Sequence, residues 1–137
     1  MHLSNTSKYT IRILANMVNH KDTTLISAKE LSDNLKIPYK FLTKIMTELV
    51  RVGFIESIRG REGGYKFLRP ASEITVGDIL ELFNDSIKDE ECILGIDSCN
   101  AKQKCALHDK WIKSKIQLQK MFKESTIESI AAEGNKI

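Results

Sequence analysis

Residues 26–70 constrain the fold of this 137-residue chain more than any other stretch. Ser27 is placed as the N-cap of a short helix, and Glu30 follows at the spacing of a capping box. Pro38 suits the first turn of a second helix, because the amide that proline lacks would have no partner there. Gly53 ends that second helix. Two short helices joined by a tight turn predict a helix-turn-helix.

A β-hairpin is predicted directly after the helix pair. Apolar residues at Phe54, Ile55 and Ile58, and then at Tyr65 and Phe67, flank a turn rich in glycine. Glycine adopts the positive φ angles that tight hairpin turns require. The order helix, turn, helix, hairpin is that of a winged helix-turn-helix.

Positive charge is concentrated in the same region. Residues 36–69 carry eight Lys or Arg and three Glu, so their net charge of 8 − 3 = +5 exceeds the +3 of the whole chain. The exposed face of the second helix and the hairpin tip would contact DNA bases and phosphates. The alternative is that these residues are ordinary solvent-exposed surface with no DNA contact. The candidate DNA-binding residues are Tyr39, Lys40, Thr43, Lys44, Thr47, Arg51, Arg59 and Arg61.

The remaining helical patterns complete a mainly α fold with a small β-hairpin wing. Residues 5–20 and the segment from Thr75 to Phe83 have the apolar spacing of core helices. A long helix is predicted from Cys105 to about Ala132, and its apolar face is too long for a domain of this size to cover. We therefore expect a winged helix-turn-helix domain in residues 1–84, a cysteine-containing loop in 85–104, and a dimerisation helix with its tail in 105–137.

All three cysteines lie in one short stretch, followed by a histidine. The candidate metal ligands are Cys92, Cys99, Cys105 and His108. An odd number of cysteines argues against a disulfide framework. Gaps of six and then five residues suit a loop around an iron–sulfur cluster better than the closely spaced ligand pairs of zinc. Reversible thiol oxidation without metal is the main alternative.

Three stretches carry a resemblance to a known family. They are Leu3-Ser4 with Lys8-Tyr9, the run ISAKELSDNLKIPYKFLTKIMTELVRVGFIESIRGREGGYKFLRP, and EITVGDILELF. Together they resemble the Rrf2 family of bacterial transcription regulators over about residues 2–111. In the wing, where the family usually has Arg-Gly-Pro-Gly-Gly-Gly-Tyr, this chain has Arg59-Gly60-Arg61-Glu62-Gly63-Gly64-Tyr65.

The resemblance implies a homodimer built on the C-terminal helix that binds double-stranded DNA at a partly palindromic operator. Similarity to the cluster-containing branches assigns Cys92, Cys99 and Cys105 as ligands of an iron–sulfur cluster, with two or four irons. The first gap is one residue longer than in those branches. One branch takes its fourth ligand from a histidine just after the third cysteine, which favours His108 here; Asp97 and Asp109 are alternatives.

The predicted function is a cytoplasmic, homodimeric transcription regulator whose operator binding is controlled by a cluster that senses redox, nitric oxide or iron status. A cluster-free thiol regulator and an iron–sulfur carrier that does not bind DNA are the competing interpretations. No phosphate-binding loop, Ser/His/Asp set or carboxylate pair stands out, so an enzyme is not expected. No apolar run approaches the roughly 18 residues of a membrane span.

Overall fold

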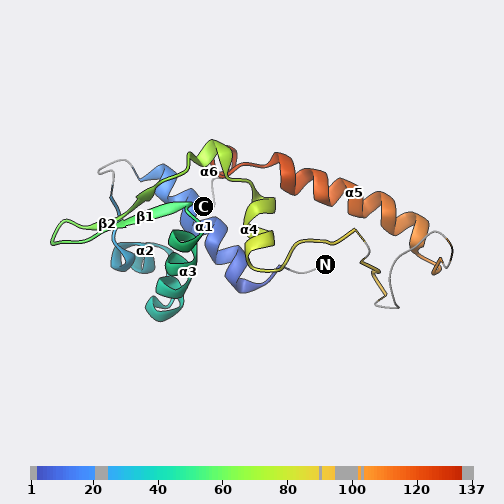
Figure 1. Ribbon diagram of the computed structural model, residues 1–137, viewed down its shortest axis with the longest axis horizontal. Coiled ribbons are helices and arrows are strands. Elements are labelled where there is room, and N and C mark those ends of the chain that lie inside the picture. The colour runs from blue at the N-terminus through green and yellow to red at the C-terminus, as the bar shows by residue number, and fades with distance from the viewer. Residues whose placement is uncertain (1–2, 21–24, 90, 95–101, 103, 134–137) are drawn as a thin grey trace.

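The computed structural model describes residues 3–20, 25–89, 91–94, 102 and 104–133. Its elements are α1 (Asn5–Asn19), α2 (Ala28–Leu35), α3 (Tyr39–Arg51), β1 (Ile55–Ile58), β2 (Gly64–Phe67), the 3-10 turn η1 (Ala71–Glu73), α4 (Val76–Leu82), α5 (His108–Glu124) and α6 (Ile127–Glu133). The hairpin and α5 project from opposite ends of a helical body (Figure 1). This architecture confirms the predicted fold class. None of the helices described, α5 included, is long and apolar enough to cross a membrane.

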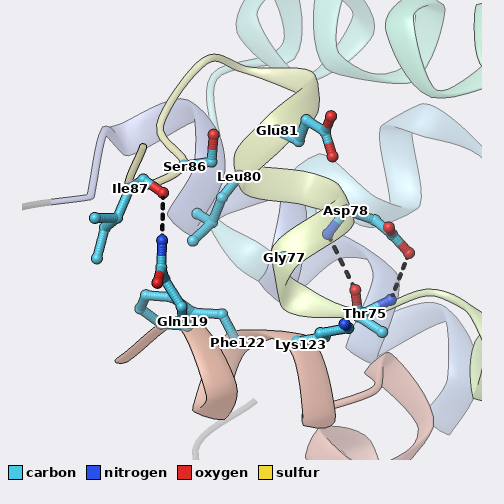
Figure 2. A pocket seen from close by; sticks show the side chains of 10 residues that line it. All are labelled: Thr75, Gly77, Asp78, Leu80, Glu81, Ser86, Ile87, Gln119, Phe122 and Lys123. Carbon is cyan, nitrogen blue, oxygen red and sulfur yellow. Dashed lines mark hydrogen bonds between the residues drawn. The ribbon is translucent and has the colours of Figure 1, made fainter. Parts of the chain in front are cut away.

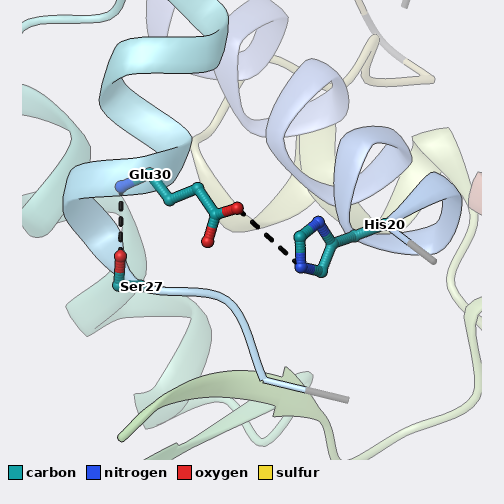
Figure 3. A network of polar contacts seen from close by, with 3 residues as sticks. All are labelled: His20, Ser27 and Glu30. Carbon is teal, nitrogen blue, oxygen red and sulfur yellow. Dashed lines mark hydrogen bonds and ion pairs between the residues drawn. The ribbon is translucent and has the colours of Figure 1, made fainter. Parts of the chain in front are cut away.

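The helix-turn-helix forms where its local signals predict. Ser27 Oγ accepts a hydrogen bond from the Glu30 amide at 3.1 Å and so caps α2. The Glu30 carboxylate points towards His20, whose Nε2 lies 4.0 Å away, instead of closing the predicted capping box (Figure 3). Lys36 takes the left-handed conformation that ends α2, and Pro38 immediately precedes α3. The turn between α2 and α3 is therefore set by local backbone chemistry.

The hydrophobic core surrounds α1. This helix packs against α2, α3, α4 and α6, so four separate parts of the chain meet on it. Side chains from all of these helices are excluded from solvent, among them Leu14, Leu31, Leu42, Leu49, Ile79 and Ile127. Burial of each such aliphatic side chain contributes about 1.5–3 kcal/mol. The orientation of α3 is consequently fixed by its packing on α1 and α2.

The wing is anchored to the body through one residue before α2. Its strands pair in the register Ile55↔Phe67 to Ile58↔Gly64. The Ile26 amide donates to the Tyr65 carbonyl at 3.1 Å, and the Tyr65 amide donates to the Ile26 carbonyl at 2.8 Å. This pairing is an isolated antiparallel bridge that joins the residue before α2 to the two-stranded hairpin.

Two wing glycines are required by close backbone approach. A Cβ on Gly64 would lie 2.7 Å from the Ile26 carbonyl oxygen, and one on Gly63 would lie 2.2 Å from the Ile58 carbonyl oxygen. Arg61 and Glu62, by contrast, are exposed on the tip. The chain can therefore carry charged residues at positions 61 and 62, while positions 63 and 64 admit only glycine.

The prediction of one continuous C-terminal helix was wrong. The helix begins at His108 rather than Cys105, and it breaks at Ser125 and Thr126. Main-chain bonds explain the break, since the Ser125 carbonyl accepts from the Val76 amide at 2.9 Å and the Ile127 amide donates to the Ile74 carbonyl at 2.8 Å. The helix α6 then turns back, and Ile127 is buried in the core of the winged helix-turn-helix.

Candidate nucleic-acid interface and cysteine segments

The predicted DNA-contacting residues of α3 lie on one exposed face. Tyr39 is 55% exposed, and Lys40, Lys44 and Thr47 are also exposed, while Thr43 is half-buried. The opposite face holds Leu42, Ile45, Met46 and Leu49, all buried. Apolar packing on one side thus presents a polar, basic helix face to solvent on the other.

The two threonines of this face are oriented by hydrogen bonds within the helix. Thr43 Oγ1 donates to the Lys40 carbonyl at 3.0 Å, and Thr47 Oγ1 donates to the Thr43 carbonyl at 2.9 Å. Each hydroxyl hydrogen is used in this way, but each oxygen keeps its acceptor capacity. The threonines can therefore accept hydrogen bonds from base amino groups such as adenine N6 and cytosine N4.

Ion pairs reduce the basic character of part of the surface. Arg51 pairs with Glu48, with Nη2 and Nε at 2.7 and 2.9 Å from the same carboxylate oxygen. Lys66 pairs with Glu56 across the hairpin at 3.1 Å. A DNA phosphate would have to compete with Glu48 for Arg51, which the sequence pattern did not indicate. Arg59 and Arg61 are exposed on the hairpin tip, as predicted.

Cys105 and His108 lie at the start of α5, and Cys92 follows Glu91, whose carbonyl binds Trp111 in the first turn of the same helix. Within the described residues, these three side chains are not assembled into one site. Cys92 and Cys105 are of intermediate exposure, and neither forms a disulfide within the described residues. The His108 amide donates to the Cys105 carbonyl at 3.1 Å, and the His108 side chain is buried. Glu91, which precedes Cys92, accepts a 2.8 Å hydrogen bond from Trp111 Nε1, one turn after His108. Cys99 lies outside the described residues.

The donor types at this helix start suit a metal or a reactive thiol. Thiolates and imidazoles are ligands of iron, and accessible thiols can be oxidised reversibly. Asp109 is exposed and pairs with Lys104 at 3.2 Å, and Asp97 lies outside the described residues. Within the described ranges, no group of three His, Cys, Asp or Glu is assembled to hold a metal ion.

Asp85 links the end of α4 to the start of α1, a contact that the sequence did not reveal. Its carboxylate accepts hydrogen bonds from the Ser4 amide at 3.0 Å and from the Ser7 hydroxyl at 2.5 Å, and also from the Ser4 hydroxyl. Partial burial raises the pKa of Asp85, but these hydrogen bonds outweigh it, so the pKa lies below its ordinary value. Asp85 is therefore a charged anchor for the N-terminus of α1.

A cavity of about 270 Å³ lies between α4 and α5. Figure 2 shows Leu80 and Gly77 of α4 on one side and Phe122 of α5 on the other. Gln119 reaches across from α5 and donates from Nε2 to the Ile87 carbonyl at 2.9 Å. The segment after α4 is thus attached to α5 at the edge of this cavity.

The exposed basic face of α3 and the glycine-dependent wing define a winged helix-turn-helix regulator of transcription. Residues 3–133 match the Rrf2 family, described as "Iron-dependent Transcriptional regulator". The match covers nearly the whole chain, and the protein belongs to the Rrf2 family. It is accordingly a DNA-binding transcriptional regulator rather than an enzyme.

Individual relatives agree with this assignment. The chain is 36% identical over 132 residues to an HTH-type transcriptional regulator of Aquifex aeolicus, covering 95% of this chain and 91% of that protein. It is 30% identical over 131 residues to the HTH-type transcriptional regulator NsrR of Oceanobacillus iheyensis, covering 95% and 89%. The fold is similar to that of CymR (YrzC), described as the global cysteine regulator of B. subtilis, with a TM-score of 0.81, 21% identity, and 96% and 97% of the two chains covered.

Proposed function

We propose that the protein acts in the cytoplasm as a homodimer that binds a partly palindromic operator in double-stranded DNA. The observation that carries this proposal is the exposed face of α3, which offers two lysines and two threonine acceptors, together with a wing hydrogen-bonded to Ile26. In this arrangement α3 enters the major groove, and Arg59 and Arg61 reach an adjacent minor groove. The two α3 helices of a two-fold dimer would lie roughly 34 Å apart, one turn of duplex.

Apolar side chains on α5 support the dimer. Ile116 and Met121 are 56% and 50% exposed, and Leu107 is also exposed just before the helix. The helix extends away from the body of the domain (Figure 1), so the single chain leaves this surface open to solvent. A second copy of α5 would bury these side chains, and the burial would favour association.

The proposed switch is an iron–sulfur cluster held by Cys92, Cys99 and Cys105, with His108 as the fourth ligand. Support comes from the position of Cys105 and His108 at the start of α5, from the hydrogen bond that attaches Glu91, the neighbour of Cys92, to the same turn, and from the description of the family as iron-dependent. When bound, such a cluster supplies a redox-active centre that oxidants, nitric oxide or low iron can alter or remove. His108 is chosen over Asp109 because Asp109 is exposed and already paired with Lys104.

A cluster-free thiol regulator is the second candidate. The partial exposure of Cys92 and Cys105, neither of which forms a disulfide within the described residues, favours it, because oxidation requires an accessible thiol. In this case reversible oxidation of Cys92 or Cys105 would replace cluster loss as the signal.

Anaerobic purification is expected to yield protein with visible charge-transfer absorption and with stoichiometric iron and sulfide. Operator affinity of the cluster-loaded and cluster-free forms, measured at one salt concentration, is expected to differ by at least about tenfold, within the usual range of allosteric coupling. Colourless protein with intact thiols whose DNA binding changes on oxidation would support the thiol regulator. Equal affinity of the loaded and cluster-free forms would reject the cluster as the switch.

The double variant Lys44→Ala and Arg59→Ala is expected to weaken operator binding by about 100-fold in either regulator. Each change removes one cationic contact with DNA. Loss of a contact with a base typically costs about 1–3 kcal/mol, and loss of a contact with a phosphate lowers by about one the slope of log affinity against log salt concentration. Binding is measured by fluorescence anisotropy at several salt concentrations. The control is Lys120→Ala, because the Lys120 side chain is 71% exposed on α5 and remote from α3. Unchanged binding by the double variant would show that Lys44 and Arg59 do not contact the operator.

A further inference from the structure

Three side chains of α5 attach the segment that leads into Cys92. Each donates a hydrogen bond to a main-chain carbonyl of that segment: Trp111 Nε1 to Glu91 at 2.8 Å, Lys115 Nζ to Asp89, and Gln119 Nε2 to Ile87 at 2.9 Å. We call this set the α5 ladder. None of these bonds was expected from the sequence.

The spacing of the α5 ladder is regular on both sides. Its donors lie four residues apart and therefore share one face of the helix. Its acceptors are alternate residues that run in the opposite direction along the chain. Four helical residues rise about 6 Å, so the acceptor carbonyls must repeat at about that distance. A shift of the segment by one residue would move all three carbonyls out of reach together, so the three bonds form or break as a set.

Burial makes this set of bonds costly to lose. Lys115 is only 3% exposed and Trp111 is 8% exposed. A buried ammonium or indole N–H that loses its hydrogen-bond partner carries a large desolvation penalty. The segment is also folded on itself, because the Glu91 amide donates to the Lys88 carbonyl at 3.0 Å and the Lys88 amide donates to Glu91 Oε2 at 3.2 Å. The carbonyls are therefore presented to α5 by a short, internally bonded turn.

The α5 ladder lies between the cysteine segment and the DNA-binding body. At one end, Cys92 directly follows Glu91. At the other end, Asp85 precedes the segment by two residues and binds Ser4 and Ser7 at the start of α1. The helix α1 packs against α3, which carries the DNA-contacting face. Hydrogen bonds and packing thus form a continuous route from a thiol to the recognition helix.

We propose that Trp111, Lys115 and Gln119 are positioning residues that hold Cys92 at the first turn of α5 and couple its chemical state to the orientation of α1 and α3. This inference rests on the proposed function as a cysteine-dependent regulator. Ligation or oxidation of Cys92 acts on the Glu91 end of the α5 ladder. Because the three bonds of the ladder form or break as a set, the segment yields as a unit and carries the change to Asp85.

Lys115→Met tests the proposal, because methionine retains an unbranched side chain but removes the donor. Removal of a buried charge together with its hydrogen bond is commonly tolerated by the fold. The matched control is Lys120→Met, on the exposed face of the same helix. Two quantities are measured: the alkylation rate of Cys92 in cluster-free protein, followed peptide by peptide against Cys105, and the ratio of operator affinities between the loaded and cluster-free forms.

In Lys115→Met, the alkylation of Cys92 relative to Cys105 is expected to accelerate about tenfold, the factor for loss of one charge-assisted hydrogen bond. The ratio of operator affinities is expected to fall towards one, while Lys120→Met behaves as the wild type. Gln119→Ala, at the half-buried far end of the ladder, should shift both quantities in the same direction. This variant replaces Lys115→Met in the test if circular dichroism shows that Lys115→Met is unfolded.

Wild-type values of both quantities in a folded Lys115→Met or Gln119→Ala variant would overturn the proposal. Faster alkylation without a change in the affinity ratio would also overturn it, since the residues would then hold the segment without coupling it to DNA. If the loaded and cluster-free forms of the wild-type protein bind operator with equal affinity, the proposed switch fails. The alkylation rates would still decide whether the α5 ladder positions Cys92, so the two failures are distinguishable.

Discussion

Gly64→Ala is expected to weaken operator binding by at least about tenfold, or 1.4 kcal/mol, while the helical body stays folded. The added Cβ would lie 2.7 Å from the Ile26 carbonyl oxygen and 2.8 Å from its carbon. Both atoms are main chain, so the overlap can be relieved only by separating Ile26 from β2. The paired Ile26 and Tyr65 bonds would break, and the wing would lose its anchor to the body. Fluorescence anisotropy with operator DNA measures the effect.

Gly77→Ala is the matched control for the wing variant. Gly77 lies in α4, and the nearest contacts of its added Cβ would be at 3.5 Å, an ordinary van der Waals distance. Alanine at such a site usually stabilises a helix by about 0.4–1 kcal/mol. Operator binding is expected to be unchanged in this control. Wild-type operator affinity in Gly64→Ala would show that the Ile26 pairing does not place the wing.

Ile127→Ala is expected to lower the free energy of unfolding by about 2–5 kcal/mol, the usual cost of truncating a buried isoleucine. Ile127 is 0% exposed and lies in the core cluster with residues of α1 and α3. If the C-terminal helix were continuous, this residue would instead lie in a helix beyond the domain. Chemical denaturation at several protein concentrations measures the change.

Met121→Ala provides the contrast, since Met121 is 50% exposed on α5. Its truncation should leave the free energy of unfolding of the monomer almost unchanged. It should weaken association between subunits. Loss of subunit association in Ile127→Ala, with no loss of monomer stability, would contradict the placement of α6 in the core.

The winged helix-turn-helix was predictable because its signals are local. Ser27 caps α2 through a neighbouring amide, Gly53 ends α3 with a φ of 82°, and Gly63 lies against the Ile58 carbonyl in the hairpin turn. Each of these effects acts within a few residues, so residue type and spacing are enough to indicate it. The residues proposed to bind DNA followed from the same periodicity, and their contacts with operator remain predictions.

The break between α5 and α6 was not predicted, although a local signal for it exists. Thr126 and Ser129 exchange hydrogen bonds between side chain and amide, each at 3.1 Å, which is the chemistry of a helix start. Apolar residues continue at helical spacing across the break, and this pattern concealed it. Pairing of Ser125 and Ile127 with the residues around Thr75 decides where the chain turns.

Sequence alone determined the class of this protein: the order of its helices, the basic hairpin, and a short stretch that gathers all three cysteines. Only the tertiary structure showed which of these elements contact one another. Asp85 meets Ser7 across 78 positions of the chain, and Lys115 reaches Asp89 across 26. Helix starts and turns are governed by interactions between near neighbours, which residue order records directly. Contacts between distant segments depend on how the whole core packs, and only the folded chain brings their donors and acceptors together.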